Sequence, residues 1–286
     1  MTLEELRLRM APINSNAQHV RLVQPELNGG VTTIEQIAAL DDTPGADLLT
    51  ISGLNQESLE FLARRYPHRF QAIAFWKCPR IADLAPVGDL ASVTHLSFYW
   101  NQRATRLWDL RRNSLLRGLA FDDFSKLKDL SDLATAVGLQ ELEFGNIIWN
   151  KAQFDSLAPL AGLTRLQSLR FNAKVIGDGD IAPLATLSGL RAMSFPPPLF
   201  ERAQLAWLRA RLGPGVASEV LQSHRPLPAF AGKMGRVKDI QLCGRGQRCL
   251  DARLDADKIA AHVVGFDALV AGFSANPGEL APVAIK

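Results

Sequence analysis

A pattern of apolar positions recurs along the chain with a period of 23 to 27 residues. Each copy ends on a phenylalanine with an aliphatic residue or methionine two places earlier, and the six copies end at Phe75, Phe98, Phe121, Phe144, Phe171 and Phe195. Leu49 and Ile51 hold the same two positions one step upstream. Apolar residues at i and i+2 are typical of a strand with one buried face. The sequence therefore predicts about seven strands, each one repeat apart.

Matching strands at a fixed period can stack as neighbours in a parallel sheet, with the rest of each repeat as the return path. The return segments carry apolar residues three apart, as in Leu127, Leu130 and Leu133, which favours short helices or 3₁₀ turns. Prolines interrupt any longer helix in these segments: Pro79, Pro86, Pro159 and Pro183. We expect an α/β solenoid in which the phenylalanine rings form an internal column.

The repeat resembles that of the leucine-rich repeat family. Copies such as Leu116-x-x-Leu119-x-Phe121 match the start of the consensus L-x-x-L-x-L-x-x-N/C-x-L, and Cys78 and Asn101 match its Asn/Cys position. The resemblance covers about residues 46–216, and units such as DLAPVGDL look most like bacterial members. It implies a horseshoe with a parallel concave sheet that usually binds proteins, and it implies no particular activity.

The two ends of the chain fall outside the period. Residues 1–45 are expected to form an N-terminal cap, with a strand at 20–23 and a short helix around 33–40. Residues 217–286 are expected to form a C-terminal tail or cap with a proline-rich loop, a strand at 237–242 and an amphipathic helix. The helix is indicated by apolar residues at 4, 3, 4, 3 spacing: Ile259, Val263, Phe266, Val270 and Phe273. The alternative is a detachable element that docks elsewhere or mediates dimerisation.

Composition adds bounds to this picture. The 286 residues are 47% hydrophobic, enough for a large core, and a net charge of +3 argues weakly for an anionic partner. Three cysteines make no dense disulfide framework. The first residues mix acids and bases where a signal peptide needs an apolar stretch, and we expect no apolar run long enough to span a membrane. These features predict a cytoplasmic protein.

Positions beside the buried apolar pair should face outward on the concave surface. They predict a partner-binding site of ten residues: Trp76, Lys77, His95, Tyr99, Trp100, Asp122, Asp123, Glu141, Glu143 and Arg170. Outward aromatic residues on neighbouring strands are the composition of an interface hot spot. Like charges on adjacent strands cost stability, which indicates that a cationic partner compensates them. The leading hypothesis is thus a non-enzymatic module that binds a protein with a basic surface.

Two alternatives stay open. The acids could serve a hydrolase or hold a divalent cation, but an open sheet offers no pocket to raise a carboxyl pKa. The histidines are scattered, Cys243 and Cys249 have no histidines nearby, and Gly244 to Gly246 lack a dinucleotide fingerprint, so we predict no metal and no cofactor. Nucleic acid is the other alternative, through clustered basic residues: Arg103, Arg106, Arg111, Arg112 and Arg117, and Lys233, Arg236, Lys238, Arg245, Arg248 and Arg253.

Overall fold

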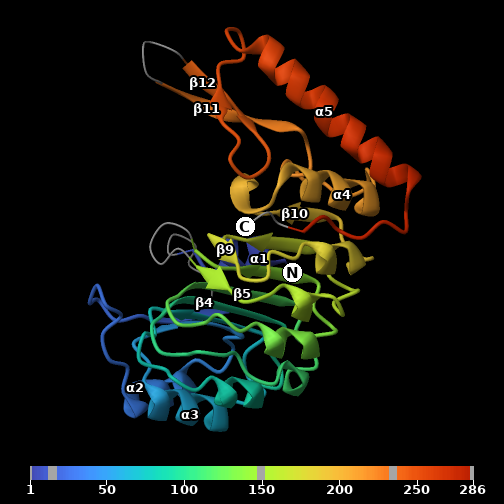
Figure 1. Ribbon diagram of the computed structural model, residues 1–286. Coiled ribbons are helices and arrows are strands. Elements are labelled where there is room, and N and C mark those ends of the chain that lie inside the picture. Colours follow the sequence, from blue (N-terminus) through green and yellow to red (C-terminus); the bar gives the residue numbers. More distant parts are fainter. Residues whose placement is uncertain (1, 12–17, 147–151, 232–236, 284–286) are drawn as a thin grey trace.

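The computed structural model describes residues 2–11, 18–146, 152–231 and 237–283 (Figure 1). Its helices are α1 (Leu3–Arg9), α2 (Ile34–Ala38), α3 (Gln56–Arg65), α4 (Arg202–Leu212) and α5 (Ala256–Ala275). Its solenoid strands are β1 (His19–Leu22), β2 (Leu48–Ser52), β3 (Ala72–Trp76), β4 (His95–Asn101), β5 (Gly118–Phe124), β6 (Glu141–Phe144), β8 (Ser168–Phe171) and β10 (Ala192–Ser194). The others are β7 (Gln153–Phe154), β9 (Val175–Ile176), β11 (His224–Ala231), β12 (Val237–Leu242) and β13 (Cys249–Leu250).

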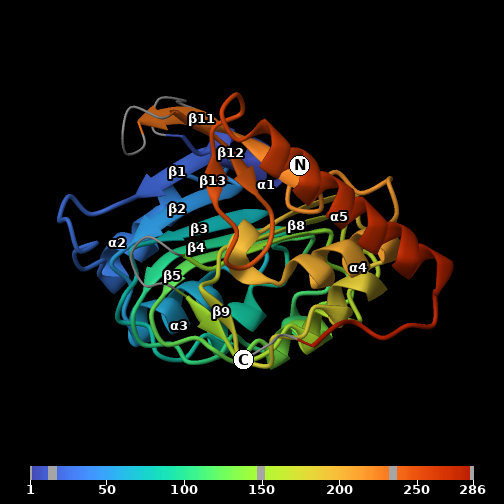
Figure 2. The same ribbon diagram turned by 45° about the horizontal axis from the view of Figure 1, so that its top comes forward.

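Successive repeats contribute neighbouring strands to one parallel sheet. The strand order is β1-β2-β3-β4-β5-β6-β8-β10, and the stack is visible edge to edge in Figure 2. Phenylalanines of successive repeats are direct partners, as Phe98 is of both Phe75 and Phe121. This arrangement confirms the predicted leucine-rich-repeat solenoid. The sheet has eight strands instead of about seven because β1, expected within the N-terminal cap, pairs with β2 in the same sheet.

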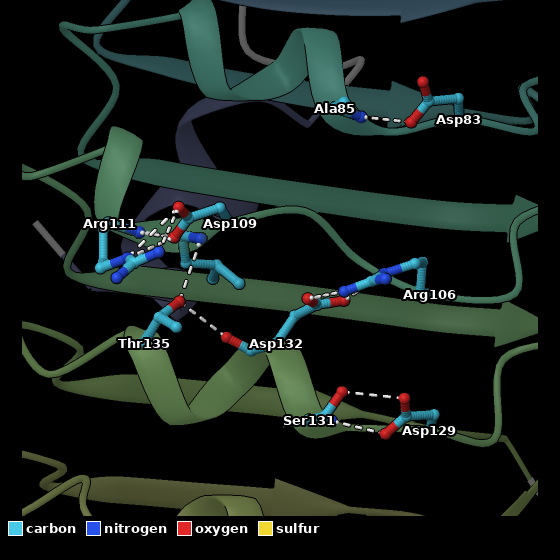
Figure 3. A network of polar contacts seen from close by, with 10 residues as sticks. Asp83, Ala85, Arg106, Asp109, Arg111, Asp129, Ser131, Asp132 and Thr135 are labelled. Atoms are coloured by element: carbon cyan, nitrogen blue, oxygen red, sulfur yellow. Dashed lines mark hydrogen bonds and ion pairs between the residues drawn. The ribbon is translucent and has the colours of Figure 1, made fainter.

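The return segments are 3₁₀ turns that start in a repeated way. A side-chain oxygen accepts a hydrogen bond from the backbone N–H two residues later, in the pairs Asp83–Ala85, Asp129–Ser131, Ser156–Ala158 and Asp180–Ala182. Figure 3 shows the first two pairs. Aspartate and serine favour such turns because their short side chains can replace a backbone acceptor. The turns on the outer side are thus specified locally, repeat by repeat.

The predicted phenylalanine column is present but has one break. Ring centroids lie 4.6 Å apart for Phe75 and Phe98, and 5.1 to 5.4 Å apart for the stacked pairs from Phe121 to Phe195. Between Phe98 and Phe121 the ring of Phe124 meets both edge-on, at 6.1 and 5.8 Å. Offset and edge contacts each add about 0.5–1.5 kcal/mol beyond burial. The column therefore continues through Phe124 at this point.

Asn101 closes the turn after β4 with four hydrogen bonds. Its Nδ2 donates to the carbonyls of Cys78 and Ile81 at 3.2 and 2.9 Å. Its Oδ1 accepts from the backbone N–H groups of Arg103 and Ala104 at 3.0 and 2.8 Å. Asn101 is buried, so these groups have no ready access to water. This is the role expected for an asparagine at the family's consensus position.

The C-terminal tail adds a separate layer at one end of the solenoid (Figure 1). Helix α5 packs on α4, with Phe266 and Phe273 buried, and strands β11, β12 and β13 form an antiparallel sheet. The predictions of a strand at 237–242 and of the final helix are confirmed. The predicted proline-rich loop is wrong, because Pro226 and Pro228 lie in β11. That strand is at the sheet's edge, where a missing N–H is tolerated.

Among the described residues, one helix, α5, is long enough and apolar enough to cross a membrane, judged by length and composition only. The expectation that no segment approaches such a span is therefore wrong on composition alone. Length and composition alone do not distinguish a membrane span from other apolar helices, and α5 packs on α4 with 17% of the stretch buried. The finding therefore carries no conclusion about a membrane.

Candidate interaction surface

Two aromatic side chains stack on the concave side of β3 and β4. Trp76 and Tyr99 are register partners, and their ring centroids lie 4.5 Å apart at an interplanar angle of 18°. They alternate with the buried Phe75 and Phe98, which places them on the opposite face of the sheet. Trp76 keeps 42% of its surface exposed. We call this pair the aromatic platform.

The residues that follow the platform have left-handed backbones. Lys77, Trp100 and Asp123 have φ values of +53°, +64° and +58°, and Gly53 holds the same position one repeat earlier with +66°. Residues with a Cβ rarely adopt this conformation, because the Cβ crowds the backbone carbonyl. Its recurrence in four repeats shows that the solenoid imposes one shape on these strand ends.

Lys77 lies between aromatic rings at this edge. Its Nζ is 5.7 Å from the Trp76 ring centroid and 6.0 Å from that of Trp100, and it donates a hydrogen bond to the carbonyl of Leu27 at 2.9 Å. Cation–π contacts of this kind contribute about 0.5–1 kcal/mol at exposed sites. The side chain of Leu27 is 89% exposed. Lys77, Trp100 and Leu27 therefore extend the apolar and aromatic surface beyond the platform.

Asp122 continues the row of the platform onto β5, where it is the register partner of Tyr99. Its Oδ1 is buried and has no hydrogen-bond partner among the described residues. Burial raises the pKa of the Asp122 carboxyl, Asp123 raises it further, and a hydrogen bond from Asn146 lowers it. Asp123 is only 6% exposed. Asp123 was predicted to face a partner, and its burial contradicts that prediction.

Helix α1 lies across the concave face and covers part of the predicted site. Leu6 and Met10 form an apolar cluster with Leu48 and Ala72, the first residues of β2 and β3. Leu3 reaches further along the sheet and is 1% exposed. The first part of the predicted N-terminal cap, residues 3–10, thus sits on the inner surface of the sheet. The sequence carried a signal for this helix, because Thr2 and Glu5 form a capping box before the apolar spacing.

The acids on β6 bind α1. Glu141 Oε2 accepts a hydrogen bond from the backbone N–H of Leu3 at 2.9 Å. Glu143 forms an ion pair with Arg7, with 2.5 Å between Nη2 and Oε2. We expected a partner's cation to compensate the acidic cluster, and in the structure Arg7 of the same chain does so. The role of Arg7 could not be predicted, because nothing in the local pattern indicates where α1 docks.

His95 also lies beneath α1. It is 3% exposed, and its Nδ1 is 2.9 Å from Thr94 Oγ1. A Cβ built on Gly118 would lie 2.4 Å from the His95 ring and 3.2 Å from the Leu3 side chain. Glycine is therefore required here by close approach of the ring and the helix. His95 lies on the predicted face of the sheet, but in this conformation it cannot contact a partner.

Arg170 lies on the concave side of β8, beyond α1, and is exposed. It lines a small hollow of about 70 Å³ with Arg7, Asp122 and Glu143. It also lines an open cavity of about 420 Å³ at the C-terminal end of the sheet, whose other polar residues are Ser168, Ser194, Ser218, Glu219 and Arg225. Of the ten predicted residues, Trp76, Lys77, Tyr99, Trp100, Asp122 and Arg170 thus remain on or beside the uncovered part of the face.

The arginines of the outer wall are largely paired (Figure 3). Arg106 binds Asp132 at 2.6 Å and Arg111 binds Asp109 at 2.9 Å. Arg112 pairs with Asp89, and Arg117 donates to the carbonyls of Ser114 and Leu116. In the tail Lys238 donates to a backbone carbonyl and Arg245 pairs with Glu201 at 3.5 Å, while Lys233 and Arg236 lie outside the described residues. This pairing reduces the positive charge available to phosphates.

Metal-binding and thiol chemistry gain no support from the described residues. They contain no group of three or more His, Cys, Asp or Glu side chains arranged to hold a metal ion. Burial raises the pKa of the Cys78 thiol to about 12 and that of Cys243 to about 11. Thiols of this kind stay protonated at neutral pH and are poor nucleophiles.

The chain is similar to several solved structures. An internalin (inlF) from Listeria monocytogenes is 20% identical with a TM-score of 0.45, and the match covers 66% of this chain and 50% of that one. An internalin C2 from the same species is 21% identical with a TM-score of 0.41, covering 68% and 84%. A leucine-rich-repeat protein from Leptospira interrogans is 13% identical with a TM-score of 0.48, covering 76% and 52%. This chain thus spans about half the length of the first and third structures.

No protein-family model matches the chain, and no curated protein matches its sequence. What the chain binds has therefore to be inferred from its own surfaces.

Proposed function

We propose that this leucine-rich-repeat solenoid is a non-enzymatic module that binds another protein through the open part of its concave face. The observation that carries the proposal is the stack of Trp76, which is exposed, on Tyr99, which is half-buried. Tryptophan and tyrosine are the residues most enriched among interface hot spots, where single truncations cost about 2 kcal/mol or more. The stack fixes both rings before binding, so little side-chain entropy remains to be lost.

The surroundings of the platform favour a partner with both apolar and basic groups. Leu27 and Trp100 extend the apolar surface on one side. Asp122 adjoins Tyr99 on the other side, with a buried carboxylate oxygen that lacks a hydrogen-bond partner among the described residues. A lysine or arginine placed beside Tyr99 would be attracted to the Asp122 carboxylate and would lower its raised pKa.

Protein binding accounts for these features better than the two alternatives. A hydrolase needs an enclosed site with a nucleophile or an acid–base pair, and the two acids on β6 are engaged by α1. Nucleic-acid binding needs uncompensated arginine or lysine, and three of the wall arginines, Arg106, Arg111 and Arg112, pair with aspartates. The stacked aromatic pair would also suit a base, but the adjacent carboxylate disfavours a phosphate backbone.

The test is a comparison of Trp76→Ala with Leu115→Ala in the full-length chain. Leu115 is 47% exposed, close to the exposure of Trp76, and lies in the turn before β5. Proteins captured from a lysate of the source organism would be quantified for each variant, and the affinity of each candidate would then be measured with purified protein. We expect at least a ~10-fold loss for Trp76→Ala and little change for Leu115→Ala.

A partner that binds wild type and Trp76→Ala equally would exclude the platform as the binding site. Capture of nucleic acid in place of protein, with affinity falling steeply as salt rises, would favour the alternative. Circular dichroism must first show that both variants are folded as wild type is.

A further inference from the structure

Helix α1 is bound to the solenoid as a peptide ligand would be. It crosses the concave sheet, with Leu3 against Glu141 and Gly118 on β6 and β5, and Met10 against Leu48 on β2. Its apolar contacts use Leu3, Leu6 and Met10, and its ion pair uses Arg7. The surface beneath it, which we call the α1-binding surface, consists of Leu48, Ala72, Ala74, His95, Gly118, Glu141 and Glu143 with Arg21.

The α1-binding surface recognises the two ends of a helix as well as its side chains. The Glu141 carboxylate accepts from the first backbone N–H of α1, that of Leu3, at 2.9 Å. At the other end Arg21 Nη1 donates to the carbonyl of Met10, the C-cap, at 3.0 Å. A carboxylate at a helix N-terminus and a cation at its C-terminus are both favourable, because of the partial charges there. The surface is thus matched to a helix of about two turns in one orientation.

The packing of α1 is separable from the core of the solenoid. Leu6, Met10, Leu48 and Ala72 form a cluster of their own, apart from the large cluster that contains the phenylalanine column. The floor of the surface is built of small residues, Ala72, Ala74 and Gly118, that leave room for another molecule's side chains. Removal of α1 would therefore expose the floor without opening the core.

We infer that the α1-binding surface is a docking site for an amphipathic helix of a partner protein, and that α1 is the resident helix which such a partner displaces. The recognised pattern is apolar residues at i, i+3 and i+7 with an arginine at i+4, as in Leu3, Leu6, Met10 and Arg7. The site is independent of the aromatic platform, which lies at the opposite ends of β3 and β4. Helix-in-groove binding of this kind obtains affinity from apolar anchors and orientation from the charges.

The probe for the test is a fluorescein-labelled peptide of residues 2–11, TLEELRLRMA. In full-length protein Leu6→Asp should drive α1 off its surface, because a carboxylate cannot be buried among apolar groups. We expect this variant to bind the peptide at least ~10-fold more tightly than wild type does. In wild type the tethered helix competes at an effective concentration in the ~mM range. The same peptide with Leu6→Asp should not bind.

A charge pair supplies the second, milder variant, since Arg7 is half exposed and lies outside the core. Arg7→Glu should weaken the docking of α1 and allow the native peptide to bind. The double variant Arg7→Glu with Glu143→Arg should restore the docking of α1 and prevent the peptide from binding. If Leu6→Asp does not fold, Arg7→Glu decides the question by the same criterion. Trp76→Ala should leave peptide affinity unchanged, so this proposal and the proposed function can fail separately.

Two results would overturn the inference. One is a folded Leu6→Asp or Arg7→Glu chain that does not bind the peptide, or binds it no better than wild type. The other is a wild-type chain that dimerises and whose dimer is abolished by Leu6→Asp, because the occupant would then be the α1 helix of a second copy. Anisotropy titration gives the first result and analytical ultracentrifugation the second.

Discussion

Replacing Leu6 with alanine tests how firmly α1 is held. Leu6 is 2% exposed and packs against Met10, Leu48 and Ala72. Burial of Leu3, Leu6 and Met10 contributes about 1.5–3 kcal/mol per side chain, and the polar contacts of the helix add about 0.5–1 kcal/mol each. Fixing the backbone from Leu3 to Met10 costs about 1–2 kcal/mol per residue. The favourable contacts and the entropy cost each sum to about 10 kcal/mol. The docking of α1 on the sheet is therefore stable by a few kcal/mol at most.

The substitution removes about 2–5 kcal/mol at a buried leucine, which equals or exceeds that margin. We therefore expect Leu6→Ala to undock α1 and to leave the solenoid folded. The assay is hydrogen exchange of the backbone N–H groups of Leu6 and Met10, which donate to the carbonyls of Thr2 and Leu6. Their exchange should become about 10–100-fold faster, while β8 keeps its protection.

The global stability supplies the control. Once α1 has left the sheet no further loss follows, so Leu6→Ala should lower the free energy of unfolding by no more than the docking margin. Phe171→Ala, in the fully buried column, should instead lower the free energy of unfolding by about 3–5 kcal/mol. A Leu6→Ala chain that loses as much global stability while its α1 N–H groups remain protected would refute the reasoning.

Two further predictions concern buried polar groups. Asn101→Ala leaves two carbonyls and two N–H groups without their partner, so it should cost about 3 kcal/mol or more in urea unfolding, whereas exposed Asn172→Ala should stay within about 0.5 kcal/mol. Asp122→Asn should raise the thermal midpoint at neutral pH, because the wild-type pKa is raised by burial and the ionised form destabilises the fold. That advantage should fade as pH falls through the raised pKa towards the ordinary value of 3.8, and an Asp122→Asn chain less stable than wild type at pH 7 would contradict it.

The repeating part of the fold could be predicted because its signal is local and periodic. The Phe and aliphatic pairs of β3 to β10 mark strand, face and register at once. Strand β11 was missed because Pro226 and Pro228 indicate a loop unless the strand is known to lie at an edge. The insertion of Phe124 into the ring column depends on three-dimensional packing that no spacing reveals.

The candidate site could be predicted in part, because its strand positions also follow the local, periodic pattern. Alternation along a strand tells which face a side chain occupies, and Trp76 and Tyr99 lie where it placed them. Alternation cannot tell what covers that face. His95, Glu141 and Glu143 lie under or against α1 through contacts between residues more than 90 positions apart in the chain. The capping box at Thr2 indicated a helix but not its destination.

The break in the phenylalanine column has a consequence for how the molecule unfolds. A solenoid is held together by contacts between adjacent repeats, so its cooperativity depends on the weakest junction. Phe98 and Phe121 meet through the edge of Phe124 where the other rings stack face to face. Helix α1 contacts Leu48 and Ala72 before that junction and Glu141 and Glu143 after it. It therefore ties together the two halves of the array, and its undocking would remove contacts between repeats that are not neighbours in the sheet.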